Sequence, residues 1–145
     1  SIFYAYVKDS SIETIELPGG LYKHNKKLYL DYVDYHKKLI IDLNEKIEKV
    51  DVDQSIYLFG AHVFAQYLIE FGLDTSHIVC LLDNDINKQG KRLYGTNMMV
   101  ESPKVLADVN NPIVILKAGV YNNEIKQDIL DNINSKVFFL GLNDD

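Results

Sequence analysis

The sequence predicts a three-layer α/β domain with about five mostly parallel strands, preceded by a strand and a long connecting helix. Short, nearly continuous apolar runs recur along the chain, which is typical of strands buried on both faces of a parallel sheet. Segments with helical spacing separate these runs, and this alternation favours right-handed crossovers. The run Ser55–Phe59 ends at Gly60, where a Rossmann-like domain turns from its first strand into a helix.

The first third of the chain contains a predicted strand and the predicted long helix. Residues 2–8 are rich in β-forming side chains, and Pro18-Gly19-Gly20 indicates a loop. From about Asn25 to Val50, apolar residues recur at alternating spacings of four and three, which indicates one face of a helix. They are Tyr29, Val33, His36, Ile40, Leu43, Ile47 and Val50. This face either packs on the chain's own sheet or forms a coiled-coil seam.

The remaining elements follow in alternation. Strands are predicted at residues 55–59, 78–82, 98–100, 112–116 and 137–140. Helices are predicted at residues 61–71, at 103–109 after the N-cap Ser102, and from Asn122 or Asn123 to about Leu130. The chain opens with Ser1 in a strand that has no turn before it, so we expect a fragment of a longer protein. Residues 1–50 are then the end of a preceding domain plus the connecting helix, and residues 51–145 are the Rossmann-like domain.

Composition excludes several classes of protein. The chain has 145 residues, of which 47% are hydrophobic and 25% charged, so disordered and collagen-like proteins are excluded. A net charge of −6 with scattered lysines argues against nucleic-acid binding. Cys80, the single cysteine, lies in an apolar run and is read as a buried hydrophobe. With no signal peptide or membrane span in the sequence, we expect a cytoplasmic protein.

Candidate ligand-binding residues follow the predicted strands, because ligands of open parallel sheets bind beyond the strands' carboxyl ends. The first turn, Gly60-Ala-His62-Val-Phe-Ala65, keeps the first glycine and the final alanine of the dinucleotide fingerprint G-x-G-x-x-G/A. His62 replaces the central glycine, and its side chain would obstruct a pyrophosphate. Gly60 therefore marks either a nucleotide site or a tight turn without a ligand.

For each of the other candidates, a ligand-binding and a structural interpretation both remain. Asp83 lies 23 residues after Gly60, close to where an acid binds ribose hydroxyls, although it also suits a cap or turn. His62 is either a base or hydrogen-bond donor, or a helix-start histidine. Lysines of the following loop could pair with phosphate or remain solvated. The candidates are Gly60, Ala61, His62, Asp83, Asn84, Lys88, Lys91, Lys117 and Tyr121, with no catalytic residue assigned and no metal-ligand spacing among the histidines.

Several segments together resemble one family. They are Tyr57-Leu-Phe-Gly-Ala61, Leu82-Asp-Asn84, Lys88-Gln-Gly-Lys91, Tyr94-Gly-Thr96, Ser102-Pro103 and Tyr121-Asn-Asn-Glu-Ile125. This pattern is similar to the C-terminal domain of S-adenosylmethionine-dependent sugar C-methyltransferases. The resemblance implies that residues 2–8 end a preceding methyltransferase domain and that residues 25–50 are the connecting helix.

The resemblance also implies a function. The methyl donor, S-adenosylmethionine, and the catalytic residues would lie on the preceding domain, so we expect no cofactor and no activity on this part alone. This domain would hold the sugar or nucleotide-sugar substrate, or stabilise the domain arrangement. Two alternatives remain: a nucleotide-sugar binding module like the N-terminal domain of bacterial sugar acyltransferases, and a structural domain that forms homo-oligomers through the Tyr29–Val50 face.

Overall fold

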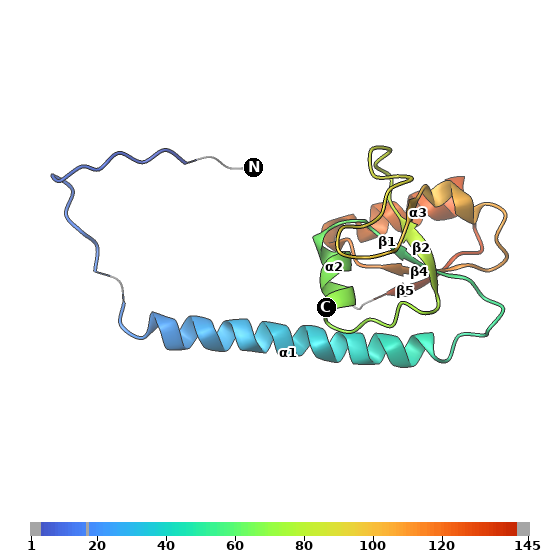
Figure 1. The fold of residues 1–145 in the computed structure, drawn as a ribbon, viewed down its shortest axis with the longest axis horizontal. Helices are drawn as coiled ribbons and strands as arrows, with labels where there is room; N and C mark the ends of the chain where they lie inside the picture. Colours follow the sequence, from blue (N-terminus) through green and yellow to red (C-terminus); the bar gives the residue numbers. More distant parts are fainter. Residues whose placement is uncertain (1–3, 17, 142–145) are drawn as a thin grey trace. The chain divides into compact units, whose positions relative to one another are not determined.

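The computed structural model describes residues 4–16 and 18–141, which fall into two compact units (Figure 1). The first unit comprises residues 1–32 and the second residues 33–145. Helix α1 (Leu21–Ile47) begins in the first unit and ends in the second. Within the described residues, no helix combines the length and the apolar character that a membrane span requires.

The second unit is built on the parallel sheet that the sequence predicts. Its strands stand in the order β3-β2-β1-β4-β5, and every pairing is parallel. They are β1 (Ile56–Phe59), β2 (Ile78–Leu82), β3 (Val100–Glu101), β4 (Ile113–Leu116) and β5 (Phe138–Gly141). The order reverses direction between β1 and β4, and such a switch point leaves a crevice beyond the strands' carboxyl ends.

Helical layers cover both faces of the sheet, as a Rossmann-like α/β fold requires. Ile56 and Leu58 pack with α1 and α2 (Val63–Glu70) on one face. Tyr57 and Phe59 pack on the other face, with the 3-10 helix η1 (Pro103–Leu106) and with α3 (Asn122–Asn132). All four residues of β1 are buried, which explains why the strand reads as a continuous apolar run.

The C-terminal part of α1 packs on the chain's own sheet. Ile40, Leu43 and Ile47 are all buried there, at 2% exposure or less. Tyr29, which continues the same helical stripe, is 67% exposed. The end of the helix therefore belongs to the compact unit that begins at Val33.

Some local expectations were wrong. Residues 4–8 form no strand, and Ser1, Ile2 and Phe3 lie outside the described residues. A strand needs a hydrogen-bonded neighbour, and no described segment pairs with this one. The helix expected at residues 103–109 is a single 3-10 turn, η1. The short strand expected at residues 98–100 is β3, which begins at Val100, and Met99 before it forms an isolated bridge with Arg92.

The docking of α1 can be tested with two substitutions on the same helix. We expect Leu43→Ala to lower the free energy of unfolding by about 2–5 kcal/mol, because it removes a buried side chain and leaves a cavity. Ile41→Ala is the control, because Ile41 is 58% exposed and its loss should change stability by less than about 0.5 kcal/mol. Urea denaturation measures both, and equal effects would show that α1 is not docked in solution.

Candidate functional site

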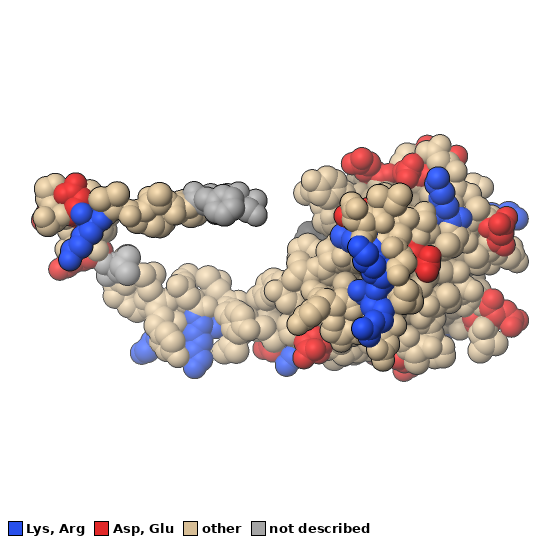
Figure 2. Space-filling model, turned by 45° about the horizontal axis from the view of Figure 1, so that its top comes forward, with Lys and Arg blue, Asp and Glu red and all other residues tan. Residues whose placement is uncertain are grey.

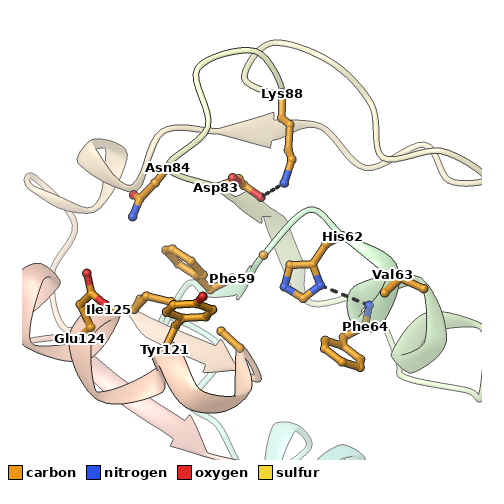
Figure 3. A pocket seen from close by; sticks show the side chains of 12 residues that line it. Phe59, His62, Val63, Phe64, Asp83, Asn84, Lys88, Tyr121, Glu124 and Ile125 are labelled. Carbon is orange, nitrogen blue, oxygen red and sulfur yellow. Dashed lines mark hydrogen bonds and ion pairs between the residues drawn. The ribbon is translucent and has the colours of Figure 1, made fainter. Parts of the chain in front are cut away.

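A pocket of about 490 Å³ lies beyond the carboxyl ends of β1, β2 and β4, at the switch point of the sheet (Figure 3). Three separate parts of the chain line it. They are Phe59, Gly60, His62, Val63 and Phe64 after β1; Asp83, Asn84 and Lys88 after β2; and Ala118, Tyr121, Glu124 and Ile125 after β4. The topology thus brings together six of the residues that the sequence predicts, namely Gly60, His62, Asp83, Asn84, Lys88 and Tyr121.

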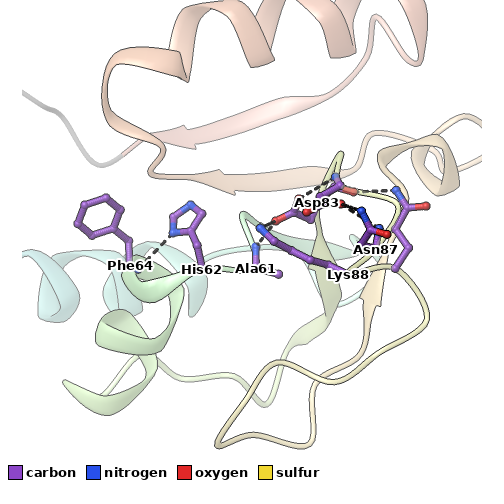
Figure 4. Close-up of polar contacts among 8 residues, drawn as sticks. Ala61, His62, Phe64, Asp83, Asn87 and Lys88 are labelled. Carbon is purple, nitrogen blue, oxygen red and sulfur yellow. Dashed lines mark hydrogen bonds and ion pairs between the residues drawn. The ribbon is translucent and has the colours of Figure 1, made fainter. Parts of the chain in front are cut away.

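Asp83 ties the β1 turn to the loop that follows β2 (Figure 4). Its Oδ2 atom accepts hydrogen bonds from the backbone N–H of Ala61 at 2.8 Å and from the Lys88 ammonium at 2.9 Å. Its Oδ1 atom accepts from the backbone N–H of Asp85 at 2.9 Å. Asp83 is 7% exposed, and it is the one buried polar or charged residue in the described part of the chain. A buried carboxylate is stable only with such partners.

Backbone hydrogen bonds reinforce this connection between strand ends. The Gly60 N–H donates to the Leu82 carbonyl at 2.7 Å, and the Asp83 N–H donates to the Glu101 carbonyl at 3.1 Å. The Gln89 side-chain amide donates to the Asp83 carbonyl at 2.9 Å. The ends of β1, β2 and β3 and the loop after β2 therefore form one hydrogen-bonded unit.

His62 begins helix α2 as its N-cap. Its backbone is extended, and its Nδ1 atom accepts the backbone N–H of Phe64 at 3.2 Å. Burial lowers the pKa of His62, the nearby Lys88 ammonium lowers it further, and the Asp83 carboxylate opposes them. The ring is therefore neutral at pH 7, and because Nδ1 is the acceptor, Nε2 carries the hydrogen.

Gly60 and His62 fill the space that a dinucleotide phosphate would need. Gly60 has a φ of +99°, and a Cβ atom there would lie 2.4 Å from Nε2 of His62, so the imidazole ring covers the glycine. The Phe64 N–H, which could bind a phosphate at this helix start, already donates to His62. The His62 ring therefore stands where a pyrophosphate would have to approach the Gly60 backbone.

The acidic position after β2 does not fit a ribose either. Both oxygens of Asp83 already accept hydrogen bonds from within the fold, and its side chain is only 10% exposed. The residues present therefore do not fit NAD, nor the ribose of S-adenosylmethionine, in the usual position at the first turn. Asp83 acts here as a turn residue, one of the two readings that its sequence position allowed.

The pocket instead has apolar walls and a few polar groups at its rim (Figure 3). Phe59 is buried at 6% exposure, Phe64 is 42% exposed and Tyr121 is 62% exposed. Asn84 and Glu124 are exposed at the rim, and Ile125 is half-buried. Six lining residues were not among the candidates that the sequence pattern predicts, namely Phe59, Val63, Phe64, Ala118, Glu124 and Ile125. One feature of the sequence could have indicated Glu124, namely its position in the first turn of the helix that follows β4.

Three candidate residues do not line this pocket. Ala61 is buried and contributes only its backbone N–H to Asp83. Lys91 is exposed, and its carbonyl accepts the Val100 N–H at the edge of β3. Lys117 lines a neighbouring cavity with Phe64 and Gly119.

The structure gives little support for a reactive cysteine or a metal site. Burial raises the pKa of the Cys80 thiol to about 11, and the Glu101 carboxylate contributes to this rise, so the thiol is protonated at neutral pH. Among the described residues, no cluster of histidine, cysteine and acidic side chains could hold a metal ion. Figure 2 shows a short band of basic side chains near the middle of the viewed face, with acidic side chains around it.

No protein-family model matches this chain, and no significant match was found among the curated proteins or the solved structures.

The packing of His62 over Gly60 can be tested by comparing two glycines. Gly60→Ala and Gly72→Ala both place a side chain at positive φ, +99° and +106°, but nothing lies within 4 Å of a Cβ at Gly72. We expect Gly60→Ala to be the more destabilising by about 1 kcal/mol, because His62 must move and release its cap. Urea denaturation measures the difference, and equal losses would contradict the packing of the imidazole on Gly60.

Proposed function

We propose that the α/β domain holds a sugar or nucleotide-sugar, and that the pocket at the switch point receives the sugar. One observation carries this proposal: residues from the ends of β1, β2 and β4 converge on a single pocket between β1 and β4. In open parallel sheets this is the usual position for ligands. Its volume of about 490 Å³ is within the range of small-molecule sites.

The groups around the pocket support a ligand with hydroxyl groups. Phe59, Phe64 and Tyr121 offer apolar surfaces to the C–H faces of a sugar ring. The Glu124 carboxylate can accept hydrogen bonds from hydroxyls, and the Asn84 amide can both donate and accept. A few polar groups around an apolar floor are the usual basis of orientation and specificity in such sites.

The same groups favour the sugar over a phosphate. The backbone N–H groups of Ala61 and Phe64 already donate to Asp83 and His62. The Lys88 ammonium is paired with Asp83 at 2.9 Å. Glu124 adds a negative charge at the rim, which opposes a phosphate there. We therefore assign the pocket to the sugar and not to the phosphates of a nucleotide-sugar.

The resemblance to sugar C-methyltransferases extends the proposal. On that basis the bound sugar is the substrate of a methyl transfer from S-adenosylmethionine, and this domain binds the substrate without performing the transfer. The β1 turn supports this division of roles, because Gly60, His62 and Asp83 leave no place for the donor's ribose. This domain would then show no methyltransferase activity when isolated.

Calorimetric titration of the chain tests the proposal. The ligands are UDP-glucose and TDP-glucose as nucleotide-sugars, with UDP, TDP, NAD and S-adenosylmethionine for comparison. We expect heat with at least one nucleotide-sugar and none with NAD or S-adenosylmethionine. Glu124→Gln should weaken nucleotide-sugar binding about tenfold or more, because it removes a charge-assisted hydrogen bond to a hydroxyl.

A matched substitution separates the site from a general charge effect. Glu70→Gln makes the same chemical change at the exposed end of α2, outside the pocket, and should leave affinity unchanged. The proposal fails if neither nucleotide-sugar produces heat, or if Glu124→Gln and Glu70→Gln bind equally well.

A further inference from the structure

The two edges of the sheet differ in how they are covered. At the β3 edge, the Gly90 N–H donates to the Val100 carbonyl at 2.8 Å, and the Val100 N–H donates to the Lys91 carbonyl at 2.9 Å. The chain therefore closes this edge with its own backbone. At the opposite edge, β5 pairs with β4 alone, and no other described segment pairs with β5.

Among the described residues, the open edge of β5 presents backbone groups that no neighbouring strand pairs with. The Phe138 N–H donates to the Pro112 carbonyl at 2.9 Å, toward the β4 side. Since a parallel ladder uses alternate residues of a strand for one neighbour, the N–H and C=O of Phe139 face the open side. An exposed row of this kind is a template for another strand.

A groove of about 660 Å³ accompanies this edge, near the amino ends of β4 and β5. Phe138, Phe139 and Leu140 form its strand side. Phe138 is 62% exposed, so a large apolar ring stands open to solvent beside the free backbone. The apolar surface and the unpaired backbone together suit an extended peptide better than a compact molecule.

The charged residues that line this groove are all lysines. Lys46 and Lys49 from the end of α1 line it, as does Lys136 just before β5. No aspartate or glutamate lines the groove, and none of the three lysines pairs with a carboxylate within the described residues. In a protein of net charge −6, this is a local basic site.

Lysines beside an edge strand also serve to prevent aggregation. Here the lysines stand beside a groove and the exposed Phe138 ring, and this combination favours a binding role over protection alone. The groove is also distinct from the sugar pocket, with which it shares no lining residue. An inference from it therefore does not depend on the proposed function.

We propose that the β5 edge binds an extended acidic peptide segment of a partner protein, which adds to the sheet as a sixth strand. The backbone of Phe139 supplies the main-chain hydrogen bonds, Phe138 packs against an apolar side chain of the peptide, and the three lysines pair with its carboxylates. This is β-strand addition with electrostatic selection of the peptide.

Peptide titration of the full ¹⁵N-labelled chain, followed by NMR, tests this inference. The probe is an acetylated hexapeptide amide of alternating glutamate and valine. Its comparisons are the same peptide with lysine in place of glutamate, and the acidic peptide N-methylated at alternate residues on its pairing edge. We expect only the unmodified acidic peptide to bind, with a downfield shift and slowed exchange of the Phe139 amide proton.

Substitutions in the protein sharpen the test. The double variant Lys46→Glu with Lys136→Glu should weaken binding of the acidic peptide about tenfold or more. The double variant Lys91→Glu with Lys104→Glu carries the same change in net charge away from the groove, and should bind almost as the parent chain does. Three outcomes would each overturn the inference. The first is equal binding of the acidic and basic peptides, and the second is binding of the N-methylated peptide. The third is dimerisation of the chain through β5 without peptide binding.

Discussion

The buried Asp83 carboxylate is the interaction on which the pocket depends. A charge that is only 7% exposed needs partners, and its three are the N–H groups of Ala61 and Asp85 and the Lys88 ammonium. They belong to the turn after β1 and the loop after β2. One side chain therefore fixes both segments in relation to the sheet, and the two segments form two of the three sides of the pocket.

This arrangement gives a common fold an unusual first turn. The strand order and the glycine turn are those of a Rossmann-like sheet. The His62 ring, however, covers Gly60, and the Asp83 carboxylate already accepts hydrogen bonds from Ala61, Asp85 and Lys88. The open space lies instead toward Phe59, Tyr121 and Glu124, where we propose that a sugar binds. The lysine-lined groove beside β5 is a second, separate surface, for which we propose an acidic peptide as the ligand.

The fold could be predicted from the sequence where burial dominates the pattern. Four of the five strands and the Gly60 turn were placed to within about one residue, because strands covered on both faces require unbroken apolar runs. The two-residue edge strand β3 shares only Val100 with the strand predicted there. The strand predicted at residues 2–8 is absent from residues 4–8, the part that the structure describes. β-forming residues without a neighbouring strand do not form a ladder. The pocket was only half predictable. In the sequence, Phe59 cannot be told apart from the other apolar residues of the core. No sequence pattern shows that the Asp83 carboxylate already accepts a hydrogen bond from the backbone.

The most direct test is the stability of Asp83→Asn beside that of Asp85→Asn, with amide hydrogen exchange measured at Ala61. Asp85 is exposed, and among the described residues its side chain accepts hydrogen bonds from Asn87 alone. If Asp83 holds the turn, Asp83→Asn should lower the free energy of unfolding by about 2–4 kcal/mol and accelerate exchange at Ala61, through the loss of charge-assisted hydrogen bonds. Asp85→Asn should do neither. Equal stability of the two variants, with unchanged exchange at Ala61, would contradict the central role of Asp83.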